Sequence, residues 1–251
     1  MNIRISSKYS SVMKRALVTG GTKGIGLGIV KMLLAEGYFV TITYGHDNES
    51  AAKFKETFEN EVSQFELLKI DQSCKVDMNA LASHVKKNGK LECLVCNTGI
   101  TLRKGLTDFT DEEWEKVMQV NVNAPVFLIR DLYTCLSQNS RIVFIGSEMG
   151  IYPHGTSLAY GITKSAVHAL ARNLVKFFEG TGTTVNAIAP GFVETEWQKN
   201  KSQEIRSKIC KKTALGRFAK VAEIADAVKF VINNPFVNGS IIEVNGGYDY
   251  K

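Results

Sequence analysis

The sequence has no run of about 18 consecutive apolar residues, the length that a membrane-spanning helix requires. Residues 1–13 are mostly polar and lack the apolar core of a secretory signal. We therefore expect a cytoplasmic protein with no membrane partner, in which residues 1–12 form a loose extension and residues 13–251 form a single domain. The formal net charge is +6, but no basic run is interleaved with aromatic residues, so we expect no nucleic-acid partner.

Cysteine is sparse, and its five residues are scattered as Cys74, Cys93, Cys96, Cys135 and Cys210. This pattern predicts free thiols in a reducing compartment. The C-x-x-C spacing of Cys93 and Cys96 invites a metal or redox hypothesis, but residues 91–96 are typical of a buried strand. Because residues three apart on a strand point to opposite faces, we predict that both thiols pack in the core and that there is no metal site.

The sequence also lacks internal repeats, low-complexity tracts and interdomain linkers. Strand-like and helix-like segments alternate instead, with strands predicted at 14–19, 38–43, 65–70, 91–96, 141–146, 183–188 and 240–244. Helices are predicted at 25–36, 49–60, 75–87, 112–136, 158–179, 201–212 and 221–232. This alternation predicts an α/β fold: a single Rossmann-like, doubly wound parallel sheet of about seven strands with helices on both faces.

Four segments with chemistry-bearing residues directly follow predicted strands. They are Gly20–Gly26, Asn97–Gly99, Ser147 and Pro190–Thr195. Ligands of doubly wound sheets bind beyond the carboxyl ends of the strands. We therefore expect these segments to converge on one site.

The first of these segments is a glycine-rich turn between a predicted strand and a predicted helix. Gly20 permits a sharp turn, Gly24 lets the backbone approach a pyrophosphate, and Gly26 lets the helix pack closely on the strand. The helix N-terminus then presents N–H groups and a partial positive charge to phosphates. Glycines also serve ordinary loops, so this segment favours a nucleotide site without requiring one.

Tyr160 and Lys164 are four residues apart in a predicted helix and therefore share a face. A free tyrosine has a pKa of about 10, and a nearby cation favours its phenolate. A tyrosine tuned in this way could exchange a proton with a carbonyl or an alcohol oxygen. Taken alone, the pair would more often be a surface tyrosine beside a solvated lysine, so the argument depends on the rest of the chain.

From about Lys14 to the C-terminus, the chain resembles the short-chain dehydrogenase/reductase family. The resemblance rests on motifs in the family's order: Thr19–Gly26 (T-G-x-x-x-G-x-G), Cys96–Gly99 (N-N-A-G, with Cys96 and Thr98 as departures), Asn121, the triad Ser147, Tyr160 and Lys164, and Pro190–Thr195 (P-G-x-x-x-T). Each motif is weak alone, but the ordered set is specific.

The resemblance implies hydride transfer between a nicotinamide and a substrate carbonyl carbon. Tyr160 would be the general acid in reduction, and Lys164 would lower its pKa and hold the ribose hydroxyls. Ser147 would hydrogen-bond the carbonyl oxygen. Asn121 would hold a water that links Lys164 to solvent, or else be a structural asparagine of the helix.

The resemblance also implies a set of cofactor-binding residues: Gly20, Thr22, Lys23, Gly24, Ile25, Gly26, Tyr44, Asp71, Asn97, Gly99, Tyr160, Lys164, Pro190, Gly191, Val193 and Thr195. NAD-specific relatives carry an acid at the end of the second strand, where this chain has Tyr44. Lys23 is placed where NADP-using relatives carry a basic residue. We expect NADP(H), unless Lys23 is a solvated loop charge and cofactor choice is relaxed. Asp71 would contact the adenine or cap helix 75–87.

For the substrate, the resemblance favours the 3-oxoacyl-[acyl-carrier-protein] reductases of fatty acid biosynthesis. It implies NADPH-dependent reduction of a 3-oxoacyl thioester on acyl-carrier protein or CoA. The same segments recur in sugar, steroid and other secondary-alcohol enzymes, which is the alternative. A binding scaffold without turnover would not need Asn121 together with the whole triad.

A segment at about 195–215 corresponds to a substrate lid, and it is basic. Its charged residues are Lys199, Lys201, Arg206, Lys208, Lys211 and Lys212 against Glu196 and Glu204. One hypothesis is that it receives an acidic carrier protein or a phosphopantetheine or CoA thioester; the other is a solvated helix face. Against the carrier, the end of the helix that follows Lys164 carries only Lys176, with Glu179 nearby. Relatives are usually tetramers, so we expect a homotetramer.

Overall fold

The computed structural model describes residues 13–153, 155 and 157–248, so the predicted extension at 1–12 lies outside the described residues. The strands are β1 Arg15–Val18, β2 Phe39–Tyr44, β3 Phe65–Lys69, β4 Leu91–Cys96, β5 Leu136–Ile145, β6 Thr184–Pro190 and β7 Ile241–Val244. The α-helices are α1 Gly24–Ala35, α2 Asn48–Thr57, α3 Lys75–Lys87, α4 Asp111–Met118, α5 Ala124–Leu132, α6 Leu158–Leu174, α7 Glu196–Lys199, α8 Gln203–Lys212 and α9 Val221–Asn233. Shorter helical turns span Glu59–Glu61, Gln119–Asn123, Glu148–Gly150 and Val175–Phe178.

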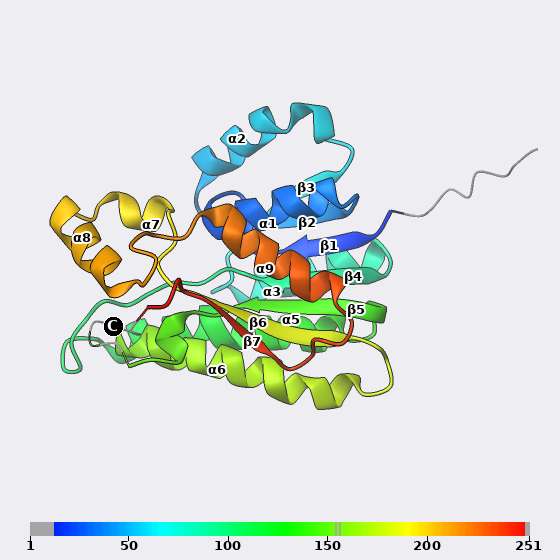
Figure 1. Cartoon of the computed structure of the whole chain (residues 1–251). Helices are drawn as coiled ribbons and strands as arrows, with labels where there is room; N and C mark the ends of the chain where they lie inside the picture. Colours follow the sequence, from blue (N-terminus) through cyan, green and yellow to red (C-terminus); the bar gives the residue numbers. More distant parts are fainter. Residues whose placement is uncertain (1–12, 154, 156, 249–251) are drawn as a thin grey trace, which may run out of the picture.

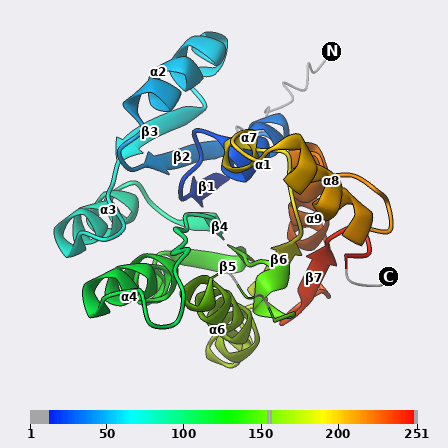
Figure 2. The ribbon, with the colours of Figure 1, turned by 90° about the vertical axis from the view of Figure 1, so that its left-hand side faces the viewer.

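The strands form one sheet in the order β3-β2-β1-β4-β5-β6-β7, and every neighbouring pair is parallel. Helices cover both faces (Figures 1 and 2). Helices α1 and α9 pack on one face, and α3, α5 and α6 pack on the other. The predicted doubly wound, seven-stranded fold is therefore confirmed.

The strands are apolar on both sides because helices exclude water from both sides of the sheet. All of β6 is buried, for example. In β4, Cys93 packs with the α1 and α9 side and Cys96 with the α3, α5 and α6 side. The two thiols are buried, free and on opposite faces, as the strand periodicity predicts.

The predicted helix over 112–136 is wrong in its middle and at its end. A π-helical turn, Gln119–Asn123, separates α4 from α5. Pro125 has no N–H to donate to the carbonyl four residues earlier, so the regular α-helical ladder is broken there. At the other end β5 begins at Leu136, which pairs with Leu91 of β4 and lengthens the strand beyond the predicted start.

The helix predicted over 201–212 is observed as α8, which begins two residues later, at Gln203. A short helix that was not predicted, α7, precedes it. Ser202 caps α8, because its hydroxyl accepts a hydrogen bond from the backbone N–H of Ile205. The pair α7 and α8 projects from one end of the sheet (Figure 1). We call residues 196–212 the α7–α8 lid. No helix in the described part of the chain is both long and apolar enough to cross a membrane.

Candidate active site

The glycine turn after β1 leaves the first turn of α1 open. Gly24 has a φ of +54°, which side-chain-bearing residues rarely adopt. A Cβ at Gly26 would lie 2.2 Å from the carbonyl oxygen of Gly20, so the turn folds directly over the helix start. The first helical turn contains no acidic residue, and Lys23 makes no side-chain capping bond. Its backbone N–H groups are thus available to phosphate oxygens.

Asn97, at the end of β4, holds this turn in place. Its Nδ2 donates to the carbonyl oxygens of Thr19 and Gly20, both at 2.9 Å. The buried hydroxyl of Thr19 in turn accepts from the backbone N–H of Asn97 at 3.0 Å. Asn97 therefore shapes the cleft with its side chain, a role that its position after a strand did not reveal.

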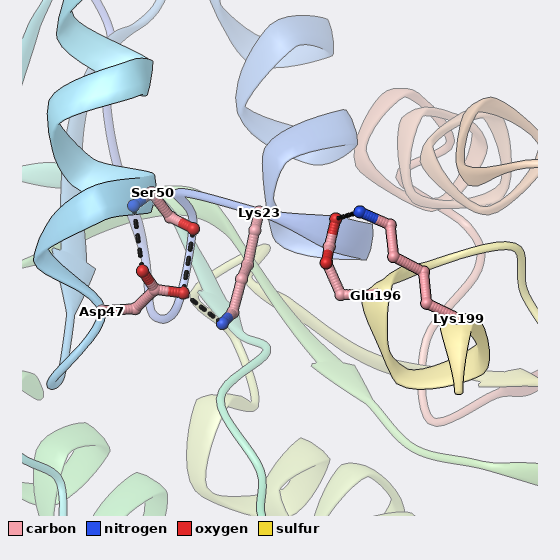
Figure 3. Close-up of polar contacts among 5 residues, drawn as sticks. All are labelled: Lys23, Asp47, Ser50, Glu196 and Lys199. Carbon is pink, nitrogen blue, oxygen red and sulfur yellow. Dashed lines mark hydrogen bonds and ion pairs between the residues drawn. The ribbon is translucent and has the colours of Figure 1, made fainter.

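Two opposite charges meet beside the glycine turn, near the end of β2 (Figure 3). Lys23 forms an ion pair with Asp47, the N-cap of α2. Asp47 also accepts from the backbone N–H and the hydroxyl of Ser50, each at 2.9 Å. Hydrogen bonds from Lys23 and then from Ser50 lower the pKa of Asp47 to about 2. The strand does end in Tyr44 rather than an acid, but the structure supplies a carboxylate from the following loop.

Asp71 lies at the same end of the cleft, after β3. Its Oδ1 accepts from the backbone N–H of Ser73 at 2.8 Å and from the Ser73 hydroxyl at 2.7 Å. The N-cap of α3 is Cys74, so the alternative role of Asp71 as that cap is wrong. His46 is 3.3 Å from the other carboxylate oxygen of Asp71.

The predicted triad meets at the ends of β5 and α6. Ser147 follows β5, and Tyr160 and Lys164 lie on the first turns of α6. The Lys164 side chain is buried, and its Nζ donates to the carbonyl oxygen of Ile145 at 2.6 Å. The same Nζ lies 5.5 Å from the centre of the Tyr160 ring.

The expected lowering of the Tyr160 pKa by Lys164 is not present. Burial raises the pKa of Tyr160 to about 12, opposed by a hydrogen bond from Ser147 and by the positive charge of Arg103. Lys164 sits against the face of the ring and is itself desolvated. Burial lowers the pKa of Lys164 to about 8.

Asn121 is buried in the π-helical turn, and both the oxygen and the nitrogen of its amide make hydrogen bonds. Its Oδ1 accepts from the backbone N–H of Ile100 at 2.8 Å, and its Nδ2 donates to the Ile100 carbonyl and to Thr163 Oγ1, both at 2.9 Å. Thr163 donates in turn to the carbonyl of Tyr160 at 2.8 Å. This side chain thus joins the loop after β4 to the helix that carries the triad.

His168 also belongs to this site, although the sequence analysis missed it. It lies one helical turn beyond Lys164, and its Nε2 accepts from the backbone N–H of Ser147 at 3.4 Å. Burial, and then the charge of Lys164, lower the pKa of His168 to about 4, so the ring is neutral at pH 7. The four-residue spacing of Tyr160, Lys164 and His168 was the available signal.

Two clefts meet at Tyr160. The first has a volume of about 510 Å³ and is lined by all of the residues predicted to bind the cofactor: Gly20, Thr22, Lys23, Gly24, Ile25, Gly26, Tyr44, Asp71, Asn97, Gly99, Tyr160, Lys164, Pro190, Gly191, Val193 and Thr195. The second, of about 430 Å³, runs under the α7–α8 lid. Both include Ser147, Tyr160 and two lid residues missed from the sequence, Trp197 and Gln198.

The α7–α8 lid covers the triad with an aromatic ring, because the ring centre of Trp197 lies 6.4 Å from that of Tyr160. Its basic character is partly neutralised by three ion pairs: Lys199 with Glu196 (Figure 3), Lys208 with Glu204, and Arg206 with Glu194. Glu194 lies before the lid in the sequence, so the count of charges within the lid overstated the lid's net positive charge.

A sequence profile described as short chain dehydrogenase matches residues 14–206. The chain belongs to the short-chain dehydrogenase family. The putative oxidoreductase YtkK of Bacillus subtilis (strain 168) is 30% identical over 245 residues, covering 94% of this chain and 96% of that protein. The 3-oxoacyl-[acyl-carrier-protein] reductase FabG of Escherichia coli (strain K12) is 29% identical over 238 residues, covering 93% and 96%.

A solved structure shares the architecture as well. The short chain dehydrogenase from Burkholderia cenocepacia J2315, in complex with NADP, superposes with a TM-score of 0.87 at 28% identity. The match covers 93% of this chain and 97% of that one. Family membership and fold thus establish an oxidoreductase of this family.

Proposed function

We propose that the protein is an NADPH-dependent reductase that converts a 3-oxoacyl thioester to the 3-hydroxyacyl thioester. One observation carries the proposal: Ser147 and Tyr160 lie on the boundary between a long cleft shaped for a dinucleotide and a second cleft under a lid. A carbonyl group at this boundary would face both the cofactor and a proton donor. That arrangement fits reduction of C=O better than simple nucleotide binding.

The first cleft fits NADP(H) on features of the chain itself. The uncapped first turn of α1 and the glycine turn would hold the pyrophosphate. Lys23 would contact the ribose 2′-phosphate, in competition with Asp47. Lys164 would hold the nicotinamide ribose. When bound, the cofactor supplies the hydride. The Burkholderia relative, determined with NADP, supports this assignment.

The protein's own residues would manage the proton. At pH 7 Tyr160 is protonated, since its pKa is about 12, and it would donate to the substrate oxygen. The hydrogen bond from Ser147 stabilises the phenolate that this transfer leaves. The positive charge of Lys164 would also stabilise that phenolate as it forms. Asn121 and His168 would act through position, by fixing α6 and Ser147 respectively.

The thioester assignment draws on the FabG relative and on the second cleft. That cleft combines apolar side chains such as Ile205 and Ile209 with cations from the lid. An acyl chain next to an anionic carrier matches this mixture. Aromatic rings in the same cleft, Phe192 and Trp197, favour a second candidate, a cyclic secondary alcohol or ketone such as a sugar or steroid.

The test measures the loss of NADPH absorbance with acetoacetyl-CoA, then repeats it with NADH and with Tyr160→Phe. We expect turnover with NADPH that falls at least 100-fold in the variant, the lower end for loss of a general acid. Absence of turnover with acetoacetyl-CoA, together with turnover of cyclic ketones, would transfer the proposal to the second candidate.

We further propose a homotetramer built on α5, α6 and the C-terminal strand, as the family resemblance implies. Large apolar side chains are exposed on α5, on α6 and on the turns that follow these two helices: Phe127, Tyr133, Leu158, Ile162 and Phe177. Association would remove them from water. An acyl-carrier protein remains the proposed macromolecular partner.

A further inference from the structure

The second cleft is lined by an excess of positive charge from two separate parts of the chain. Arg103 comes from the loop after β4, whereas Lys201, Lys208 and Lys212 come from the α7–α8 lid. The carboxylate among the described lining residues is Glu148, which is 3% exposed and lies against the backbone of Gly191. The surface that a ligand would touch is therefore cationic.

Three basic residues of this cleft have no carboxylate partner among the described residues: Arg103, Lys201 and Lys212. Lys212, at the C-terminal end of α8, rests 5.8 Å from the ring centre of Tyr248, so Arg103 and Lys201 are considered as a pair. By contrast, Lys104 on the same loop pairs with Glu113 at 2.7 Å, and Lys208 pairs with Glu204 at 2.6 Å. These two neighbouring lysines are therefore neutralised, whereas Arg103 and Lys201 have no carboxylate partner among the described residues.

Both cations line the same cleft as the proton donor Tyr160. Burial, and then the like charge of Arg103, hold the pKa of Lys201 below its usual range. The charge of Arg103 also acts on the Tyr160 hydroxyl. The ammonium of Lys201 rests 6.0 Å from the ring centre of Phe192, which lines the same cleft. An anion bound in this cleft would be attracted by both cations and would offset the repulsion between them.

A buried polar group points to the same space. Gln198 is 9% exposed and lines both clefts, and its Oε1 has no hydrogen-bond partner among the described residues. An unpaired buried carbonyl oxygen is costly, so a donor from a bound molecule is expected there. This acceptor would take a donor group of a bound molecule and not its anionic group, so it is a second polar contact in the cleft that is separate from the two cations.

We propose that Arg103 and Lys201 form an anion subsite, so that the preferred carbonyl substrate carries a carboxylate or phosphate group. This inference rests on the proposed reductase function and narrows its substrate class. An anion between the two residues would bridge the loop after β4 and the α7–α8 lid. Substrate charge would therefore help to hold the lid over Tyr160 and to exclude water from the proton transfer.

The anionic oxygens could belong to either of two sources. One is the phosphate of a phosphopantetheine or CoA thioester, and the other is the carboxylate of a free 3-oxo acid. Two matched pairs separate them: acetoacetyl-CoA against the phosphate-free acetoacetyl-N-acetylcysteamine, and acetoacetate against neutral ethyl acetoacetate. Each pair keeps the reacting carbonyl and changes the charge.

The experiment measures kcat/KM for all four substrates in the wild type and in Arg103→Gln and Lys201→Gln. Lys104→Gln and Lys53→Gln are the controls, because they remove the same charge from the same loop and from α2 without lining either cleft. We expect each test variant to lower kcat/KM about tenfold or more for one anionic substrate, the size expected for one charge-assisted hydrogen bond. The neutral member of that pair and both controls should change less than about twofold.

A loss confined to acetoacetyl-CoA would identify the phosphate, and a loss confined to acetoacetate would identify the carboxylate. Equal loss on charged and neutral members, or no loss, would overturn the subsite while leaving the reductase function intact. If no 3-oxo compound is turned over, calorimetry of 3-hydroxybutyryl-CoA and 3-hydroxybutyrate with NADPH-loaded protein tests the subsite without chemistry. Binding that Arg103→Gln leaves unchanged, or no binding at all, would then reject it.

Discussion

At the scale of single residues, burial governs the chemistry of the site. Burial raises the pKa of Tyr160 to about 12 and lowers the pKa of Lys164 to about 8, because it disfavours the charged form of each side chain. The helical spacing of the two residues correctly predicted their proximity. It did not predict the direction of the tyrosine shift, because desolvation depends on what covers the ring.

Lys164 should make stability depend on pH. Its ordinary pKa of 10.5 falls to about 8 in the folded chain. Between these values the unfolded chain holds the proton and the folded chain has released it, so the free energy of unfolding should rise with pH. Tyr160 acts oppositely above pH 10, where the unfolded phenol ionises first and stability falls.

Lys164→Met isolates this effect. We expect the variant to lose activity yet to be more stable than the wild type near pH 7, by roughly 2 kcal/mol, because a desolvated charge is removed. The advantage should shrink above about pH 8. Urea unfolding at several pH values measures it, and a gap that stays constant with pH would contradict the assignment.

Asp47 should weaken the preference for NADPH, since its carboxylate pairs with Lys23 and would repel a 2′-phosphate. Asp47→Asn keeps the cap of α2, because asparagine is an equally good N-cap. We expect the ratio of kcat/KM for NADPH to that for NADH to rise about fivefold, corresponding to about 1 kcal/mol. Lys23→Gln should move the ratio the other way. If Asp47→Asn improved NADH instead, the proposed contact of Lys23 would be wrong.

At the scale of elements, the interruption between α4 and α5 is as important as the helices. The π-helical turn places Asn121 where it reaches both Ile100 and Thr163. In a continuous α-helix over 112–136, the side chains after Gln119 would point in different directions about the helix axis. The hydrophobic period correctly predicted helical structure in this segment. Pro125 determined where the regular helix is interrupted, and the early start of β5 determined where it ends.

Asn121→Ala should therefore act on structure before chemistry. It leaves the partly buried backbone groups of Ile100 and the buried Thr163 hydroxyl without this partner, and we expect a loss of about 3 kcal/mol in unfolding free energy. Asn123→Ala in the same turn is the control, because that amide makes one 3.3 Å bond to Gln119. The control should lose less than about 1 kcal/mol. Similar losses in both would show that the clamp is not specific.

At the scale of the whole molecule, several helices expose large apolar side chains to solvent. Phe177 is 67% exposed on the turn after α6, and Ile162 is 42% exposed on α6. Light scattering should give about four times the 27.7 kDa chain mass. Ile162→Glu and Phe177→Glu should reduce that mass, whereas Val62→Glu, beside the edge strand β3, should not. A monomer in the wild type would end the tetramer proposal.

The sequence by itself determined the order of strands and helices, the parallel sheet and the edge where the site lies. Those features follow from local periodicity and from the rule that carboxyl ends of parallel strands share an edge. Only the tertiary structure decided that Asp47 reaches Lys23, that Arg103 and Lys201 line the same cleft, and that Tyr160 is desolvated. Such contacts join loops from different strands, and their distances depend on how each loop leaves the sheet, which no periodicity within one segment encodes.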